Sequence, residues 1–360
     1  MWELFCYKYQ MLPLNRILVR ANNFIGDVVM ALPAMAALRE AYPRAEITVL
    51  AQEWVSPVLR SCPTLVDRVL SYDRPFHKTA PGRKALIQQL RSEHFDAVLL
   101  FQKAFEIAWV MRWARIPVRV GFSVEGRGWL LTHKIPYHRV HHPVHRILRN
   151  LELLQTIGIH SDRVLFPMEI PPAAQEWATQ WLAEKKLLGR PLIGIHPNVS
   201  KAGGTARQWP IERFKDLITR LLKGPYGVVL LGSAVSNEMF QPLIDIRHPQ
   251  FHSLLGKTDL IQSMALFKRL NLLMSCDSGP VHMAYALNTP VIAIFGPTNP
   301  HLTGPWGDRS ATVQAPVDCR PCFETHCPID HRCMNWIRVE DVLQAASRFI
   351  DFPQEVSISL

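Results

Sequence analysis

The segment from Asp277 to His282 has the residue types and spacing best suited to chemistry. It reads Asp-Ser-Gly-Pro-Val-His and follows a short apolar run that ends at Cys276. A loop of small residues that opens a helix gathers free backbone N–H groups and the positive helix end at one point, which suits a phosphate group. Ser278 can add a hydroxyl, and His282 lies three residues after Gly279, near enough to face the same anion. The pattern indicates a nucleotide or sugar-nucleotide diphosphate site, but it fits an ordinary capped helix in a parallel-sheet protein equally well.

Asp27 is the candidate for acid–base chemistry. It lies in a loop after the apolar run 16–20, next to Gly26, whose missing side chain lets a substrate approach the backbone closely. A carboxylate in this place could act as a general base. Aspartate is also a favoured cap at the start of a helix, and the position taken alone favours the cap.

The loop 196–210 is a third candidate, because it is rich in glycine, hydroxyl and basic residues after another apolar run. Ser200, Thr205 and Arg207 offer hydroxyls and a cation that suit a phosphate clamp. No Gly-Lys-Ser/Thr closes the loop, so it is not a Walker A sequence, and an ordinary surface loop remains the alternative. Farther along, Glu238 in the segment 232–238 could accept hydroxyl protons from a ribose, or the segment could begin a helix.

Apolar runs that alternate with helical patterns must position these residues. In the first half, strands are expected at 16–20, 46–50, 66–70 and 96–100, and helices over 28–42 and 82–92. After a proline-bounded break at 167–172 and a bridging helix over 173–186, strands are expected at 192–196, 228–232, 272–275 and 291–295. This alternation predicts an α/β protein with two doubly wound domains, 11–172 and 173–337, and a cleft between the carboxyl ends of their strands. A final helix over 338–351 is expected to pack back on the first domain.

Length and composition limit the class of protein. The 360 residues allow two domains of ordinary size, and the apolar fraction of 48% fits a globular chain. No apolar run approaches the ~18 residues that cross a bilayer. The N-terminus has no signal-peptide pattern, so we expect a cytoplasmic protein in which residues 1–10 are an extension.

The formal net charge of +10 is unevenly spread. The segment 103–149 holds nine basic residues and two acidic ones. Such an excess favours an anionic partner, either a phosphorylated substrate, a membrane surface or nucleic acid. Nucleic acid is disfavoured because the basic residues are not interleaved with a recognisable recognition helix. A solvated basic face without a partner would show the same composition.

Four of the seven cysteines lie in one loop-like segment, 317–336. They are Cys319, Cys322, Cys327 and Cys333. The first two form a Cys-x-x-Cys pair, which fits a structural zinc site, a redox-sensitive pair or thiols packed in a surface lobe. The spacing of the second pair does not match a zinc ribbon with two such motifs.

Taken in order, these motifs resemble those of the bacterial ADP-heptose:lipopolysaccharide heptosyltransferases, and most closely type II. The motifs are Gly26-Asp27 with Leu32-Pro33, the loop ending Arg207-Gln208-Trp209-Pro210, Gly232-Ser233, Gly256-Lys257-Thr258, the segment from Asp277 to His282, and Phe295-Gly296-Pro297-Thr298. The resemblance runs from about residue 16 to 336, and the four-cysteine segment also looks like one seen in many members. It implies a GT-B fold of two Rossmann-like domains and an inverting, metal-independent sugar transfer.

The resemblance implies roles for particular residues on the donor side. Asp277, Ser278, Gly279 and His282 match the segment that binds the donor diphosphate and sugar, and Lys257 and Thr258 match a loop near the adenine. Arg207 stands where the family has a phosphate-binding lysine, which keeps the charge but changes the shape. Ser236 stands where some members have a ribose-binding acid, and Glu238 lies two residues farther on.

On the acceptor side, Asp27 matches the family's proposed catalytic base. His142 and Arg146 match a basic pair associated with the phosphorylated core, and Arg127 lies in a family-like Glu-Gly-Arg-Gly turn. The implied partners are ADP-heptose and a phosphorylated acceptor of the lipid A–Kdo–heptose type, met at the inner face of the cytoplasmic membrane without a cofactor. The rival hypothesis is a non-catalytic module that binds a nucleotide or nucleotide-sugar. A dehydrogenase is disfavoured, because no Gly-x-Gly-x-x-Gly follows the first strand.

Overall fold

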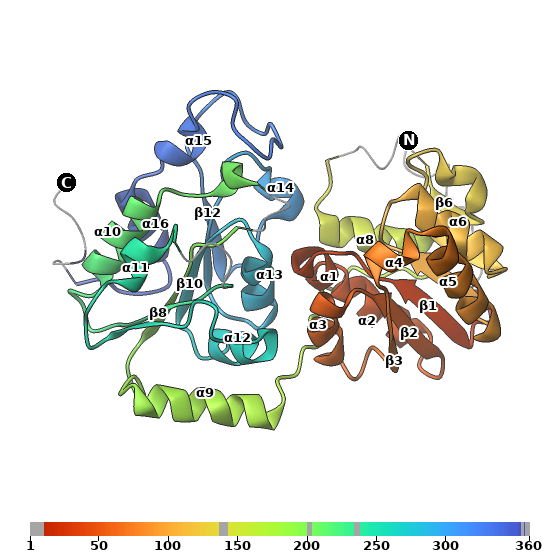
Figure 1. The fold of residues 1–360 in the computed structure, drawn as a ribbon, viewed down its shortest axis with the longest axis horizontal. Helices are drawn as coiled ribbons and strands as arrows, with labels where there is room; N and C mark the ends of the chain where they lie inside the picture. Colours follow the sequence, from red (N-terminus) through yellow and green to blue (C-terminus); the bar gives the residue numbers. More distant parts are fainter. Residues whose placement is uncertain (1–10, 137–142, 200–203, 234–237, 354–355, 357–360) are drawn as a thin grey trace. The chain divides into compact units, whose positions relative to one another are not determined.

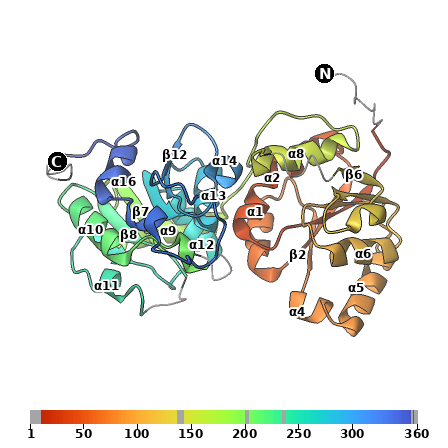
Figure 2. The same ribbon diagram turned by 90° about the horizontal axis from the view of Figure 1, so that it is seen from above.

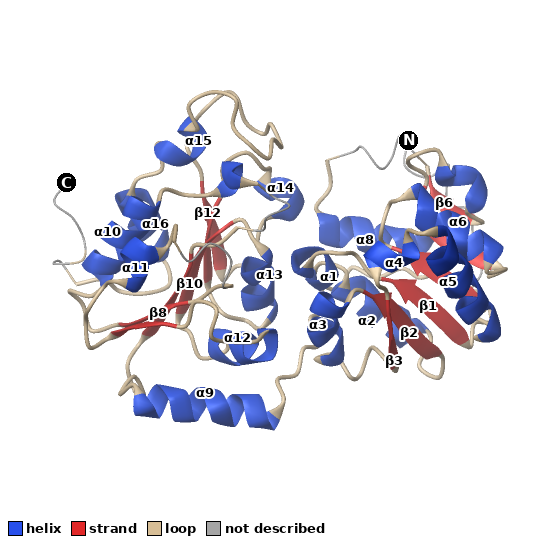
Figure 3. Cartoon of the chain, viewed as in Figure 1, coloured by secondary structure: helices blue, strands red, loops and turns tan. Residues whose placement is uncertain are grey.

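The chain divides into two compact units, Met1–Glu169 and Ile170–Leu360. The computed structural model describes residues 11–136, 143–199, 204–233, 238–353 and 356. In each unit the strands form a central sheet and helices cover it (Figure 3). The boundary lies three residues before the predicted one, so the helix expected to bridge two domains begins the second unit.

The first unit is built around a six-stranded parallel sheet of order β3-β2-β1-β4-β5-β6. Its strands are β1 (Arg16–Arg20), β2 (Glu46–Ala51), β3 (Arg68–Ser71), β4 (Ala97–Leu100), β5 (Val118–Phe122) and β6 (His133–Ile135). Its helices are α1 (Ile25–Val29), α2 (Leu32–Ala41), η1 (Glu53–Val55), α3 (Ser56–Arg60), α4 (Arg74–His77), α5 (Ala80–Ser92), α6 (Phe105–Trp113), η2 (Arg127–Leu130) and α8 (Arg146–Gln155).

Helices cover both faces of this sheet. α2 packs on α8, and α5 packs on α6, on opposite sides of the strands (Figure 2). Leu86 and Leu90 of α5 join Leu18 and Val98 of the strands in one buried cluster. The single helix expected over 28–42 is two helices, because Pro33 stands at the start of α2, where a missing N–H costs little.

The second unit repeats the plan, with sheet order β12-β11-β10-β7-β8-β9, again parallel throughout. Its strands are β7 (Leu192–His196), β8 (Gly227–Leu230), β9 (Phe251–Ser253), β10 (Leu272–Cys276), β11 (Val291–Ile294) and β12 (Ser310–Val313). Its helices are α9 (Pro172–Glu184), η4 (Thr205–Arg207), α10 (Ile211–Leu221), α11 (Gln241–Ile244), α12 (Leu260–Phe267), α13 (Gly279–Ala286), α14 (Pro300–Thr303), α15 (Arg332–Asn335) and α16 (Val339–Ala346).

In this unit α10, α11 and α16 lie on one side of the strands, and α12 and α13 lie on the other (Figure 1). The position of the last helix, α16, differs from the predicted one. Val339, Val342 and Leu343 of α16 are buried in the core of the second unit, against β11, β12 and α10. The expectation that a helix over 338–351 packs on the first domain is therefore wrong, because its apolar stripe completes the second sheet's cover.

The strand orders locate the candidate sites. In each sheet, the direction in which successive strands are added reverses once. The reversal lies between β1 and β4 in the first unit and between β7 and β10 in the second. Loops at the carboxyl ends of two such strands diverge and leave a crevice where ligands bind. Asp27 follows β1, and the segment 277–282 follows β10, so both lie at these points. None of the helices in the described residues is long and apolar enough to cross a bilayer.

Candidate active site

Asp27 lies inside α1 and pairs with Arg146. The residue at the N-cap of α1 is Phe24, so the prediction that Asp27 is the cap is wrong. Its carboxylate Oδ1 instead accepts a hydrogen bond from Arg146 Nη1 at 2.7 Å. The Asp27 side chain keeps 20% of its surface exposed and that of Arg146 keeps 40%, so solvent and substrate can reach the pair. A carboxylate in the first turn of a helix is also favoured by the helix dipole.

Lys103 is a third charged residue of this group, and it was not among the predicted site residues. It follows β4, the neighbour of β1 on the other side of the crevice. The residue is exposed as a whole, but its ammonium lies 5.5 Å from the centre of the Phe122 ring. Partial desolvation, then the positive charges of Arg146 and Arg149, lower the pKa of Lys103. Its place after the strand beside β1 was the signal that could have found it.

Arg127 has a different position from the one predicted. Its side chain is fully buried, and its guanidinium donates to the backbone carbonyls of Phe122, Gln102 and Ala104 at 2.9, 2.8 and 3.1 Å. Burial lowers the pKa of Arg127 to about 10, which still leaves it charged at neutral pH. The guanidinium cannot reach an acceptor phosphate from this position. It holds the loop after β4 onto β5 instead.

Other members of the basic segment also have partners within the protein. Arg119 donates to the carbonyls of Leu130 and Ile116, both at 2.6 Å, and Arg149 is buried and paired with Glu152. Of the nine basic residues counted in 103–149, the described ones that are exposed are Lys103, Arg112, Arg115 and Lys134. The net charge of the segment therefore overstates its basic surface.

In the second unit, α13 begins as predicted, straight after the small-residue loop. Ser278 is its N-cap in an extended conformation, but its side chain makes no capping hydrogen bond to the helix. The Ser278 hydroxyl instead lies 3.1 Å from that of Ser275. Pro280 occupies the first turn, where no backbone N–H is needed. The start of α13 thus presents a helix end without a side-chain cap, as an anion site requires.

Asp277 links this helix start to two other loops. Its Oδ2 accepts a hydrogen bond from the Thr298 hydroxyl at 2.7 Å and pairs with Arg207 Nη1 at 3.4 Å. Asp277 is 5% exposed, whereas the Arg207 side chain is 32% exposed. The carboxylate therefore orients the cation, and the partly exposed guanidinium is the group that a diphosphate can meet. Thr298 belongs to the motif Phe295-Gly296-Pro297-Thr298 but was not among the predicted site residues.

His282 lies within α13 and is buried. Its Nδ1 lies 3.3 Å from the hydroxyl of Tyr285, one turn farther along the helix. Burial raises the pKa of Tyr285, so the phenol keeps its proton and serves as a neutral partner. His282 therefore lies in the first turns of α13, as predicted, and the Tyr285 hydroxyl holds its imidazole ring in place.

The remaining predicted donor contacts lie at the carboxyl ends of neighbouring strands. Thr205 in η4 and Glu238 before α11 are exposed, and so is Lys257, whose Nζ donates to the Ser253 carbonyl at 3.2 Å. The Thr258 hydroxyl is 2.9 Å from that of Ser263, at the start of α12. Three further predicted contacts lie outside the described residues; they are His142, Ser200 and Ser236.

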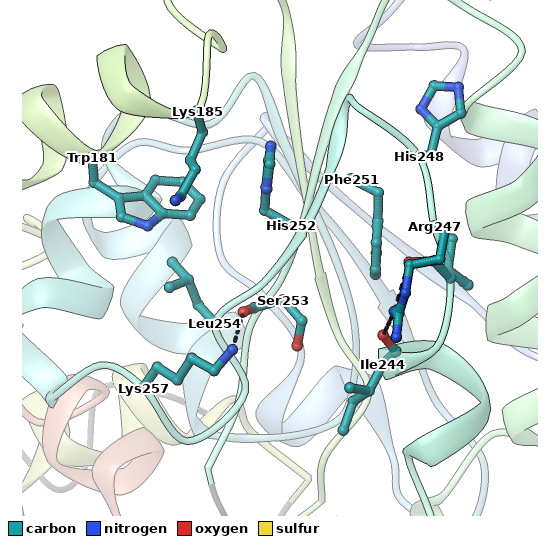
Figure 4. Close-up of a pocket in the computed structure, with 11 residues that line it drawn as sticks. Trp181, Lys185, Ile244, Arg247, His248, Phe251, His252, Ser253, Leu254 and Lys257 are labelled. Carbon is teal, nitrogen blue, oxygen red and sulfur yellow. Dashed lines mark hydrogen bonds between the residues drawn. The ribbon is translucent and has the colours of Figure 1, made fainter.

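A pocket of about 530 Å³ lies along β9, at the edge of the second sheet (Figure 4). Its lining residues are Trp181, Lys185, Ile244, Ile246, Arg247, His248, Phe251, His252, Ser253, Leu254 and Lys257. The lining is basic and contains no acidic side chain. Trp181 and Lys185 come from and just after α9, and Lys257 reaches back toward Ser253 (Figure 4). Only Lys257 is a predicted donor contact, and neither η4 nor the start of α13 lines this pocket.

The four cysteines have free thiols with different exposure. Cys319 and Cys322 are exposed, Cys327 is half-buried and Cys333 is buried. Burial, then the neighbouring thiols of Cys319 and Cys327, raise the pKa of Cys333 to about 11, so it stays protonated at neutral pH. Across the described part of the chain, no three His, Cys, Asp or Glu side chains are arranged to hold a metal ion.

Comparison with known proteins gives one consistent result. A family model described as glycosyltransferase family 9 (heptosyltransferase) matches residues 83–332. Lipopolysaccharide heptosyltransferase 2 of Escherichia coli is 28% identical over 311 residues, 83% of this chain and 88% of that protein. Lipooligosaccharide heptosyltransferase 2 of Haemophilus influenzae is 28% identical over 308 residues, with the same coverage. The solved ADP-heptose LPS heptosyltransferase II of E. coli aligns with a TM-score of 0.77 at 25% identity, covering 93% of this chain and 98% of that one. The predicted GT-B type of two Rossmann-like domains is confirmed.

Proposed function

The chain belongs to glycosyltransferase family 9, the heptosyltransferases, and from this we propose that it transfers a heptose from ADP-L-glycero-D-manno-heptose to the phosphorylated inner core of lipopolysaccharide. The observation that carries the proposal is the Arg207–Asp277 pair beside the uncapped start of α13. Two relatives named heptosyltransferase 2 and a solved heptosyltransferase II support the same donor and acceptor class.

On the donor side, the second unit binds the ADP-sugar. The partly exposed guanidinium of Arg207 and the N–H groups at the start of α13 meet the diphosphate, with His282 nearby. Lys257 and Thr258 contact the adenine end, and Thr205, Ser200, Ser236 and Glu238 supply further contacts. As the bond between the anomeric carbon and the diphosphate breaks, negative charge grows on the leaving ADP. Fixed positive groups that meet this charge lower the barrier more than those that only bind the ground state.

On the acceptor side, Asp27 takes the proton of the attacking hydroxyl as its oxygen bonds to the anomeric carbon, and ADP leaves with the electron pair of the broken bond. Attack from the face opposite the leaving group inverts the anomeric configuration. Arg146, with His142, meets a phosphate of the lipid A–Kdo–heptose acceptor. The site needs no metal ion, so turnover by the purified enzyme should withstand EDTA; loss of turnover that magnesium restores would overturn this.

We propose that the enzyme works in the cytoplasm at the inner face of the membrane, as a peripheral protein, because its proposed acceptor is anchored there by a lipid. Exposed Lys103, Arg112, Arg115 and Lys134 supply charges that anionic headgroups attract. No nucleic acid takes part.

A transferase and a non-catalytic nucleotide-binding module differ in one respect that can be measured. We expect calorimetry to show binding of ADP and ADP-heptose, and we expect ADP release from ADP-heptose only when the phosphorylated acceptor is present. Binding without acceptor-dependent release would favour the binding module. Absence of nucleotide binding would contradict both.

A further inference from the structure

The four-cysteine lobe, residues 317–336, is bonded to the two loops that hold Asp277. On one side it meets η4: Nε2 of His331 lies 2.7 Å from the Ala206 carbonyl, and the Ala206 N–H donates to the Thr325 carbonyl at 3.0 Å. A carbonyl can only accept, so His331 carries its proton on Nε2. On the other side, the N–H groups of Cys322 and Phe323 donate to the Pro297 carbonyl at 3.0 and 2.9 Å.

Two glycines show how closely the lobe is pressed against these loops. A Cβ on Gly204, just before η4, would lie 1.9 Å from the Thr325 carbonyl oxygen, and its φ of +67° also favours glycine. A Cβ on Gly296 would lie 2.3 Å from Met334 Sδ and 3.2 Å from Cys333 Sγ. At Gly204 the loop backbone lies directly against the backbone of the lobe, and at Gly296 it lies against the side chains of Met334 and Cys333.

A residue from each of the two loops contacts the same oxygen, Oδ2 of Asp277. Arg207 follows Ala206 and pairs with Asp277 Oδ2 at 3.4 Å; Thr298 follows Pro297 and donates to that oxygen at 2.7 Å. In each case the residue that contacts Asp277 is the immediate neighbour of a residue whose backbone is bonded to the lobe. The lobe lies beyond the end of β12 in the second unit, where α15 is labelled (Figure 1).

We propose that the four-cysteine lobe is a brace for the donor-diphosphate site, and that His331 is its positioning residue. His331 adopts a left-handed conformation with φ +57°, and its own N–H donates to Cys327 Sγ at 3.2 Å. The start of α15 is thereby fixed and the imidazole directed at Ala206. Through Ala206, the lobe fixes the position of Arg207 and does not itself contact the substrate. This inference rests on the proposed function only in naming the diphosphate as the ligand.

The test compares His331→Ala with His331→Gln, whose amide can still donate, and with the control Asn335→Ala. Asn335 is an exposed residue of the same lobe, and its amide donates to the Asp330 carbonyl and not to η4. We expect calorimetry to give an ADP Kd about tenfold higher for His331→Ala, an intermediate value for His331→Gln and an unchanged value for Asn335→Ala. The acceptor KM should not change. An unchanged ADP Kd in His331→Ala, or equal weakening in all three variants, would overturn the proposal.

A double-mutant cycle with Arg207→Ala tests the route of the effect. If His331 acts through Arg207, its substitution should cost little once Arg207 is gone. Full additivity would contradict the brace.

Hydrogen exchange of the ligand-free protein separates this inference from the proposed function. The Ala206 amide should exchange faster in His331→Ala while the sheet amides keep their protection. Uniformly faster exchange would show mere loss of stability and would overturn the positioning role. If the wild type binds no ADP, the proposed function fails, but the exchange of Ala206 still decides whether His331 holds η4.

Discussion

Arg146 Nη1 lies 2.7 Å from Asp27 Oδ1, so the residue expected to bind the acceptor's phosphate is bonded to the residue expected to take the acceptor's proton. The two are 119 positions apart in the sequence. The pair couples acceptor binding to the base, because a phosphate that approaches Arg146 must share the guanidinium with the carboxylate. Arg146 can bind both at once, since its planar fork presents several donors.

Asp27→Asn should lower kcat by roughly 10²- to 10⁴-fold, the usual contribution of a general base. The amide oxygen can still accept from Arg146, so the change removes the proton acceptor while leaving a partner for the guanidinium. Calorimetry should give an ADP Kd within about twofold of the wild type, because the carboxylate belongs to the first unit. Near-native turnover in this variant would remove Asp27 from the base role.

Arg146→Ala should raise the acceptor KM by about tenfold and leave the donor KM unchanged, since a charge-assisted contact to phosphate is lost. In the wild type the acceptor KM should also rise with ionic strength and on dephosphorylation of the acceptor, because salt screens exposed charges. Arg44→Ala, which removes an exposed cation of the first unit outside the basic segment, is the control. If only kcat falls, Arg146 acts through Asp27 and not on the acceptor; if nothing changes, the segment is a solvated surface.

Arg207→Ala should raise the ADP Kd by about tenfold and slow transfer, because the partly exposed cation beside the start of α13 is removed. Arg207→Lys should recover much of the affinity, since lysine restores the charge though not the planar shape. Arg213→Ala is a matched control, because this half-buried arginine of α10 donates to the Asn335 carbonyl. An unchanged ADP Kd and unchanged turnover in Arg207→Ala would contradict the proposed contact between Arg207 and the diphosphate.

Arg127→Met should destabilise the first unit by about 2 kcal/mol or more, because buried carbonyls lose their donor. Thermal denaturation should show a Tm lowered by several degrees, while Arg112→Met stays near the wild-type value. The folded variant should keep its acceptor KM. A raised acceptor KM at an unchanged Tm would restore the predicted acceptor contact.

Local patterns predicted the elements well. The runs 16–20 and 192–196 are strands as expected, and the small-residue loop does precede α13. Buried strands and helix starts can be predicted because they depend mainly on residues that are close together in the sequence. Alternation of strands and helices was enough to predict two doubly wound sheets.

Contacts between distant residues were beyond the same reasoning. Arg127 counts as a basic residue in the sequence, yet the turn at Gly126, with φ +71°, directs it inward onto carbonyls of another loop. Asp27 carries the residue type of a cap, and only the fold shows that its partner is Arg146. The brace on η4 joins residues 125 positions apart, and no spacing rule indicates it.

Mass spectrometry of the acceptor after incubation with ADP-heptose tests the central claim most directly. We predict that heptose-deficient, phosphorylated lipopolysaccharide core gains the mass of one heptose unit with the wild-type enzyme, and gains none with Asp27→Asn. No gain with the wild type, under conditions in which it binds ADP-heptose, would contradict the assignment as a heptosyltransferase of the lipopolysaccharide core.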